Sequence, residues 1–245
     1  MFRLRYWSLP VLLVLVSACN FTEGIYLEDD GSGKISINLD GSGMMGMLGE
    51  EMTKSKEKAI DSTISFRTFL EEKKDSIATL SEEDQADLKK LEPFEMHMVM
   101  NPETKEMKFD LYRDFGNLDE VSDIFRDFQE ASSVGPASKK QSPTSNLSNQ
   151  ATQVDYSFKA NIFKRTARVI DSVLQQQSID SLAGVEMFFS GSTYKLEYHF
   201  PRRVKSSSAS AATFSADGKT LYYEVDLLTY MKNPDTLNIE IELEE

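Results

Sequence analysis

Apolar and polar residues alternate along several segments of the chain, which is the pattern of strands with one buried face. The most regular example covers residues 94–111, where apolar side chains occupy every second position on both sides of the polar turn 101–105. A second example, residues 25–39, surrounds the turn 29–33, which is rich in aspartate and glycine. Because these turns hold the residues that tight reversals favour, each example predicts an antiparallel hairpin.

Further alternating segments predict strands elsewhere, and helical periodicity separates them. The further strands are expected over 62–66, 156–162, 194–200, 219–228 and 237–243, and helices over 69–80, 117–128 and 167–189, with another leading through Lys58. Ser81, followed by three acidic residues, predicts one more helix that runs to Glu92 and stops at Pro93.

This arrangement predicts the fold class. Strands come in hairpins with helices interspersed, so we expect an α+β fold, with an antiparallel sheet built from hairpins and several helices packed on it. Residues 133–153 are rich in Ser, Pro, Gln and Asn and predict a flexible linker or insertion. It would separate the N-terminal part of the domain, 19–132, from the C-terminal part, 154–245.

Residues 1–18 have the three-part layout of a secretory signal. Arg3 and Arg5 lie in a basic start, residues 9–16 are mostly apolar, and two small residues follow. The apolar run is shorter than the roughly 20 residues that a membrane-spanning helix needs. We therefore expect residues 1–18 to be a signal peptide that is removed on export.

Cys19 is the only cysteine in the chain. Residues 16–19, Val-Ser-Ala-Cys, resemble the lipobox of bacterial lipoproteins, in which the cysteine is acylated and becomes the first residue of the mature protein. The resemblance implies that Cys19 attaches the protein to a membrane through lipid. The alternative is a plain secretory signal that leaves a free thiol in an oxidising compartment.

The residues after Cys19 bear on localisation by resemblance to lipoprotein sorting. Asn20 is not the aspartate that often retains lipoproteins in the inner membrane, so the outer membrane is favoured. The acidic run that directs some Bacteroidota lipoproteins to the cell surface is absent directly after Cys19, since the first acid is Glu23. We expect a lipid-anchored protein of the cell envelope that faces the periplasm.

The charge of the mature chain excludes one class of partner. Removing Arg3 and Arg5 leaves 25 basic and 40 acidic residues, a net charge of −15. A nucleic-acid-binding protein would show a basic stripe or patch instead.

No catalytic or metal-binding motif stands out. The two histidines, His97 and His199, alternate with apolar neighbours and are expected on polar strand faces. No His-rich zinc spacing, nucleophile elbow or phosphate-binding loop occurs, so we expect no cofactor, no metal and no catalytic residue. The turn 29–33 offers oxygen ligands but lacks the spacing of a calcium loop.

Two surfaces are candidates for binding. The methionines of residues 94–107 share one strand face, which forms either buried core or an adaptable apolar groove. Arg202, Arg203 and Lys205 form a basic group that either contacts anions such as lipid phosphates or is ordinary solvated charge.

The C-terminal part resembles a known family. Residues 194–201 form a strand that ends in Phe-Pro, Val204 follows, and a polar turn at 217–220 leads into an aromatic strand. This succession is similar to the C-terminal part of LppM-like lipoprotein domains, and the early strand pair at 26–39 is compatible with them. The resemblance implies a membrane-tethered α+β domain without catalytic assignment that contacts membrane or lipid components.

Together these features predict a non-enzymatic envelope lipoprotein whose domain binds a lipid, glycan or protein partner near the membrane. Two alternatives remain open. The first alternative is a carboxylate-dependent hydrolase of envelope glycans. The second is a structural or assembly subunit of an envelope complex.

Overall fold

The computed structural model describes residues 19–43, 59–118, 121, 151–182 and 186–245. The predicted helix leading through Lys58, most of the predicted helix 117–128 and all but the last residues of the predicted linker 133–153 lie outside this part of the chain.

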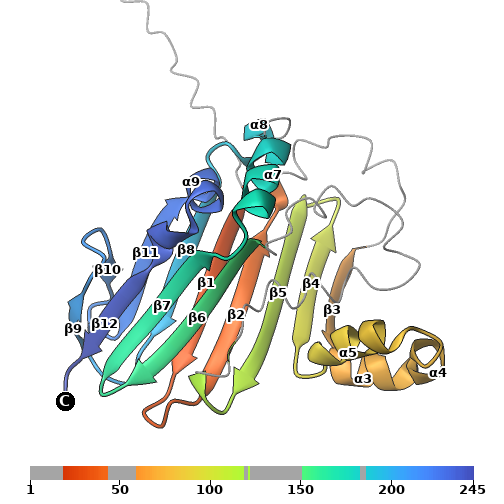
Figure 1. Ribbon diagram of the computed structural model, residues 1–245, viewed down its shortest axis with the longest axis horizontal. Helices are drawn as coiled ribbons and strands as arrows, with labels where there is room; N and C mark the ends of the chain where they lie inside the picture. The colour runs from red at the N-terminus through yellow and green to blue at the C-terminus, as the bar shows by residue number, and fades with distance from the viewer. Residues whose placement is uncertain (1–18, 44–58, 119–120, 122–150, 183–185) are drawn as a thin grey trace, which may run out of the picture.

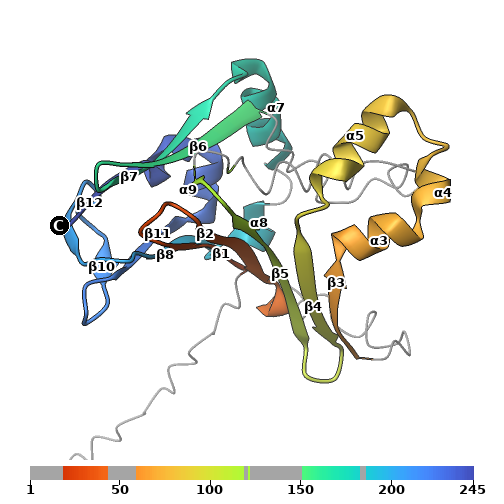
Figure 2. The same cartoon turned by 90° about the horizontal axis from the view of Figure 1, so that it is seen from below.

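Two β-sheets face each other and form the body of the domain (Figures 1 and 2). The larger sheet has the strand order β10-β11-β8-β1-β2-β5-β4-β3, and the smaller has the order β6-β7-β12-β9. The strands of the larger sheet are β1 (Asn20–Leu27), β2 (Gly33–Asp40), β3 (Ile60–Ser65), β4 (Glu95–Asn101), β5 (Glu106–Phe115), β8 (Thr193–His199), β10 (Thr213–Phe214) and β11 (Thr220–Asp226). Those of the smaller sheet are β6 (Thr152–Lys159), β7 (Ile162–Val169), β9 (Val204–Ser207) and β12 (Ile239–Leu243).

The strand pairing confirms the predicted α+β class. Every pairing between the described strands is antiparallel except that of β1 with β8, which is parallel. Because β1 and β8 come from opposite ends of the chain, this pairing places the N-terminal and C-terminal parts in one sheet. The hairpins predicted over 25–39 and 94–111 are β1–β2 and β4–β5.

The core lies between the two sheets. Alternation sends every second apolar side chain inward, and the fully buried ones include Ile25, Ile35, Phe163, Leu196, Tyr198, Leu221 and Ile241. Burying a side chain of this size stabilises the fold by about 1.5–3 kcal/mol.

The helices form two groups. The helices α7 (Ser172–Leu182), α8 (Glu186–Phe189) and α9 (Leu227–Lys232) lie at the end of the two sheets where β1 begins (Figure 1). The helices α3 (Phe66–Glu72), α4 (Lys74–Ile77) and α5 (Glu82–Lys90) form an excursion between β3 and β4 that stands apart from the smaller sheet (Figure 2). As predicted, Ser81 caps α5 and accepts a hydrogen bond from the backbone N–H of Asp84 at 3.1 Å.

Two predictions in the C-terminal part were wrong. The single strand expected over 156–162 is the hairpin of β6 and β7, whose turn residues Ala160 and Asn161 have positive φ of 51° and 65°. The helix expected from residue 167 begins only at Ser172, because β7 extends to Val169. Neither α9 nor the 3-10 helix η5 (Pro234–Leu237) was predicted.

The methionine face of β4 and β5 continues the core face of the larger sheet. Met96 lies opposite Leu111, which lies opposite Ile37, so all three side chains share one side. Leu111 and Ile37 are buried and Met96 packs against the core, whereas Met98 and Met100 are only partly buried. The face is therefore core near β2 and less enclosed toward β3.

Candidate functional site

Cys19 directly precedes β1 and is bound to the sheet by backbone hydrogen bonds. Its N–H donates to Ser192 Oγ at 3.1 Å, and its carbonyl oxygen accepts from the N–H of Thr193 at 3.3 Å. Cys19 is 2% exposed and Ser192 is fully buried. No spacer therefore separates the predicted lipid attachment site from the folded domain.

The helices α7 and α9 are connected to this position. The N–H of Leu227, the first residue of α9, donates to the carbonyl oxygen of Ser192 at 2.9 Å. At the other end of α9, the carbonyl oxygen of Met231 accepts from Gln175 Nε2 of α7 at 2.8 Å. The helix α9 is short, because its six residues rise only about 1.5 Å each. The bonds at its two ends therefore hold α7 and the start of β1 at the same end of the domain. We call this end of the domain, which carries Cys19, α7, α8 and α9, the anchor end.

A buried ion pair joins the two sheets near the middle of β1 and β7. Glu23 of β1 and Arg165 of β7 are each 1% exposed. Arg165 Nε donates to Glu23 Oε1 at 3.1 Å, and Arg165 Nη2 donates to Glu23 Oε2 at 3.0 Å. This two-point geometry matches the planar guanidinium to the planar carboxylate and is the strong form of such a pair.

Tyrosines surround the pair. The hydroxyl groups of Tyr156 and Tyr194 donate to Glu23 at 2.7 and 2.9 Å, and that of Tyr198 donates to the same carboxylate. On the other side, Arg165 Nη1 donates to the carbonyl oxygen of Leu237 at 3.3 Å, and Nη2 reaches the Tyr230 hydroxyl at 3.5 Å. We call these residues, Glu23, Arg165, Tyr156, Tyr194, Tyr198 and Tyr230, the buried polar cluster.

The surroundings of Glu23 keep it ionised. Burial by itself would raise its pKa, but the charge of Arg165 and the hydrogen bonds from Arg165, Tyr198 and Tyr156 outweigh burial, so the pKa lies below 4.5. Burial and the neighbouring Glu23 charge hold the pKa of Tyr194 and of Tyr198 well above 10.0. Since five donor groups occupy the carboxylate, its chemistry is that of a fixed charge that orients β1 against β7.

Arg202, from the predicted basic group, joins three loops. Its Nε donates to Asp29 Oδ1 at 2.8 Å, its Nη1 to the carbonyl oxygen of Glu244 at 3.1 Å, and its Nη2 to Asn161 Oδ1 at 3.0 Å. Asp29 lies after β1, Asn161 in the β6–β7 turn and Glu244 after β12. Arg202 therefore connects both sheets at one end of the domain.

The other two basic residues lie nearby but are held differently. Lys205 Nζ pairs with Glu242 at 2.7 Å. The side chain of Arg203 covers Gly218, whose φ is +70° and where an added Cβ would lie 3.1 Å from Arg203. The structure thus brings Arg202, Arg203 and Lys205 to one end of the domain.

This basic group and Cys19 lie at opposite ends. Since β1 and β8 are parallel, Cys19 and Thr193 share one end, whereas the segments after Leu27 and His199 share the other. A strand of eight residues, such as β1, spans about 26 Å at 3.3 Å per residue. That length separates the basic group from the anchor end.

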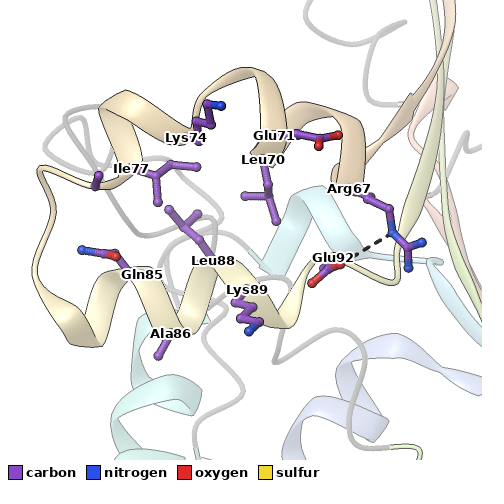
Figure 3. A pocket seen from close by; sticks show the side chains of 11 residues that line it. Arg67, Leu70, Glu71, Lys74, Ile77, Gln85, Ala86, Leu88, Lys89 and Glu92 are labelled. Atoms are coloured by element: carbon purple, nitrogen blue, oxygen red, sulfur yellow. Dashed lines mark ion pairs between the residues drawn. The ribbon is translucent and has the colours of Figure 1, made fainter.

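The helical excursion contains a groove of about 610 Å³ between α3–α4 and α5 (Figure 3). Leu70, Ile77 and Leu88 point into it from both sides, and charged side chains surround them. Arg67 and Glu92 pair at 3.6 Å at one end of the groove, with 72% and 44% of their side chains exposed. The volume falls in the range of small-molecule sites, but the charged side chains around it remain in contact with solvent.

Both histidines make contacts on the outer face of the larger sheet, as the alternation predicted. His97 Nε2 lies 2.9 Å from Asp61 Oδ1, and the ring of His199 stacks on Tyr26 with 4.0 Å between centroids. Asp110 lies opposite His97, and partial burial raises its pKa even though Lys34 and His97 oppose the shift.

Neither a metal site nor a membrane-spanning helix is found among the described residues, and the comparisons with known proteins found no match. Within the described ranges, no group of three or more His, Cys, Asp or Glu side chains could hold a metal ion, and no helix is long and apolar enough to cross a membrane. No protein-family model, curated protein or solved structure matches the chain.

The buried polar cluster was not predicted from the sequence. One signal for it was present, since Glu23 precedes Ile25 and Leu27 by two and four positions and so shares their inward face. Tyr194 and Tyr198 are likewise in register with Leu196. A charged residue on the apolar face of a strand marks a buried partner of opposite charge.

Proposed function

We propose that this chain is a bacterial envelope lipoprotein, held on a membrane by lipid attached to Cys19, with a non-enzymatic binding role for its α+β domain. The observation that carries the proposal is the junction at Cys19. The signal-like residues 1–18 end there, and β1 begins at Asn20. The first described strand thus follows directly after the point where the lipobox resemblance ends the signal.

Lipidation at this position holds the domain permanently on the membrane. Each buried methylene of an acyl chain contributes about 0.8 kcal/mol, so the two or three chains of a bacterial lipoprotein make a stable anchor. Because β1 follows Cys19 without a spacer, the anchor end of the domain lies against the bilayer. The binding surfaces are then presented at a fixed height above it.

The test of the anchor uses the single cysteine. Cells fed an alkyne-bearing fatty acid are expected to label the wild-type protein, and mass spectrometry is expected to find a mature chain that begins at an acylated Cys19. Cys19→Ser is expected to lose both the label and the partition into detergent. The matched variant Ser17→Ala, at the second-to-last residue of the signal, is expected to keep both. A wild-type protein with a free Cys19 thiol or an intact signal would overturn the proposal.

The proposed location is the outer membrane, on the periplasmic side, with a lipid, glycan or protein partner. Density fractionation of the inner and outer membranes tests whether the protein lies in the outer membrane. Resistance to protease in intact cells tests whether it faces the periplasm. Crosslinking in the native cell identifies the partner, and recovery of one stoichiometric envelope complex would favour the assembly-subunit alternative.

One observation favours the enzymatic alternative. Asp110 has a raised pKa and lies opposite His97, which itself contacts Asp61, so titratable groups gather on the outer face of β3–β5. A hydrolase of envelope glycans would use such a carboxyl group as its acid. Release of soluble fragments from purified envelope glycan by wild type, and its loss in Asp110→Asn, would establish this alternative.

A further inference from the structure

The anchor end of the domain carries a patch of exposed apolar side chains. Val169, Ile170, Val173 and Leu174 are 42%, 53%, 65% and 38% exposed. They lie at the end of β7 and in the first turn of α7, and we call them the α7 patch. The other large apolar side chains that are exposed among the described residues, Tyr26, Ile60, Phe69 and Phe214, lie in four different elements.

The first turn of α7 directs its side chains the opposite way from an ordinary surface helix, which buries apolar residues and exposes polar ones. Asp171 fixes its start, because Oδ1 accepts the N–H groups of Val173 and Leu174, both at 2.9 Å. Gln175 then turns inward, is 8% exposed and donates to the carbonyl oxygen of Met231. In this first turn a polar side chain is thus buried while two apolar neighbours face outward, which indicates that the outer side of the turn meets an apolar environment.

The position of the patch identifies that environment. Ser192 binds Cys19 and the first residue of α9, and α9 binds α7 through Met231 and Gln175. With no spacer after Cys19, acyl chains attached there enter the bilayer at the end of the domain that displays the patch. A bilayer is therefore the apolar surface closest to it.

We propose that the α7 patch inserts into the lipid bilayer that holds the acyl chains of Cys19, so that the domain has a second membrane contact and one fixed orientation. This proposal rests on the proposed lipidation of Cys19. An apolar face of this kind lies about 5–10 Å deep, at the boundary of headgroups and acyl chains. Residues 169–189 contain no lysine or arginine, so the insertion depends on apolar contact and not on anionic lipid.

The chain offers a clean fluorescent reporter for the test. Its single tryptophan, Trp7, lies in the signal, so the mature lipoprotein has none. Val173→Trp places an indole in the α7 patch. The matched control is Phe214→Trp, because Phe214 is also exposed, at 42%, but pairs with Leu221 near the end of β8 that is remote from Cys19. Each lipidated variant is reconstituted into phosphatidylcholine vesicles with ordinary or brominated acyl chains.

The expected result is that the Val173→Trp emission shifts to shorter wavelength in vesicles and loses intensity with brominated lipid, whereas the Phe214→Trp emission does neither. Adding anionic lipid or salt is expected to leave the quenching unchanged. Two further measurements show that the anchor is present: both variants float with the vesicles, and mass spectrometry finds the added mass of the acyl chains. A floating, acylated Val173→Trp protein whose emission is not quenched overturns the insertion while leaving the proposed anchor intact. Failure to float, with a free Cys19 thiol, overturns the anchor itself.

Discussion

At the scale of single residues, the Glu23–Arg165 pair is a buried interaction that needs close compensation for the cost of desolvation. Both charges are almost fully removed from water, which costs several kcal/mol per ion unless geometry and hydrogen bonds compensate. Here the two-point contact and three tyrosine hydroxyl groups satisfy the carboxylate. Because Glu23 belongs to the larger sheet and Arg165 to the smaller, the pair specifies how the sheets are aligned.

Arg165→Met tests this role. The substitution keeps most of the side-chain volume but leaves Glu23 buried without its counter-charge, so we expect the free energy of unfolding to fall by about 3–5 kcal/mol. The control Tyr194→Phe removes one hydrogen bond to the same carboxylate and is expected to cost about 1.5–3 kcal/mol. Urea unfolding of the purified variants, followed by circular dichroism, measures both. An Arg165→Met protein as stable as wild type would contradict the assignment.

The same pair predicts how stability depends on pH. Its neighbours lower the pKa of folded Glu23 below 4.5, so its ionised form stabilises the fold fully above that pH and the contribution is lost as the pH falls through the lowered value. In Arg165→Met, burial dominates and the pKa of Glu23 rises instead. We therefore expect the gap in unfolding free energy between wild type and Arg165→Met to narrow as the pH falls from 7 toward 4. A gap that stays constant over this range would show that Glu23 does not titrate as argued.

At the scale of elements, the sequence predicted strands best where alternation is purely apolar against polar. The hairpin β4–β5, the strand β2 and β1 from Ile25 onward follow this alternation, whereas the start of β1, with Glu23 on the inward face, does not. The helix α5 was predicted from its cap instead. The strand β7 was missed because its inward positions are Phe163, Arg165 and Ala167, and the charged middle residue interrupts the apolar period. The sequence did not predict the buried polar cluster either. Its residues come from four strands and from α9, and they meet only in the folded state.

The helices of the helical excursion contribute little to the core. No residue of α4 or α5 is buried, and only Phe66 is buried in α3. We expect Leu88→Ala in α5 to cost about 1 kcal/mol or less, whereas Leu196→Ala in β8, where the side chain is fully buried, costs about 2–5 kcal/mol. Amide hydrogen exchange is expected to be faster in α5 than in β8. Equal costs and equal exchange would mean that the excursion folds as one unit with the two sheets.

At the scale of the whole molecule, the domain has two ends with a proposed role, with Cys19 and the α7 patch at one and Arg202 at the other. This separation of about 26 Å allows the predicted anion contact to be tested apart from the anchor. Arg202 bonds to Asp29, Asn161 and Glu244, whereas Arg203 covers a turn. We expect Arg202→Ala to lower the unfolding free energy by about 1.5–3 kcal/mol, because it removes charge-assisted bonds, and Arg203→Ala to change it by about 0.5 kcal/mol or less.

The same two variants separate a structural role from a lipid-binding role. If Arg202 acts only by connecting the loops, vesicle association of the lipidated protein stays at the wild-type level in both variants and is insensitive to salt. Contact of Arg203 with lipid phosphate would instead appear as weaker association of Arg203→Ala with anionic vesicles at unchanged stability, restored by lysine at that position. That second outcome requires the basic end of the domain to reach a membrane other than the one that holds Cys19, because the length of β1 separates it from the anchor end.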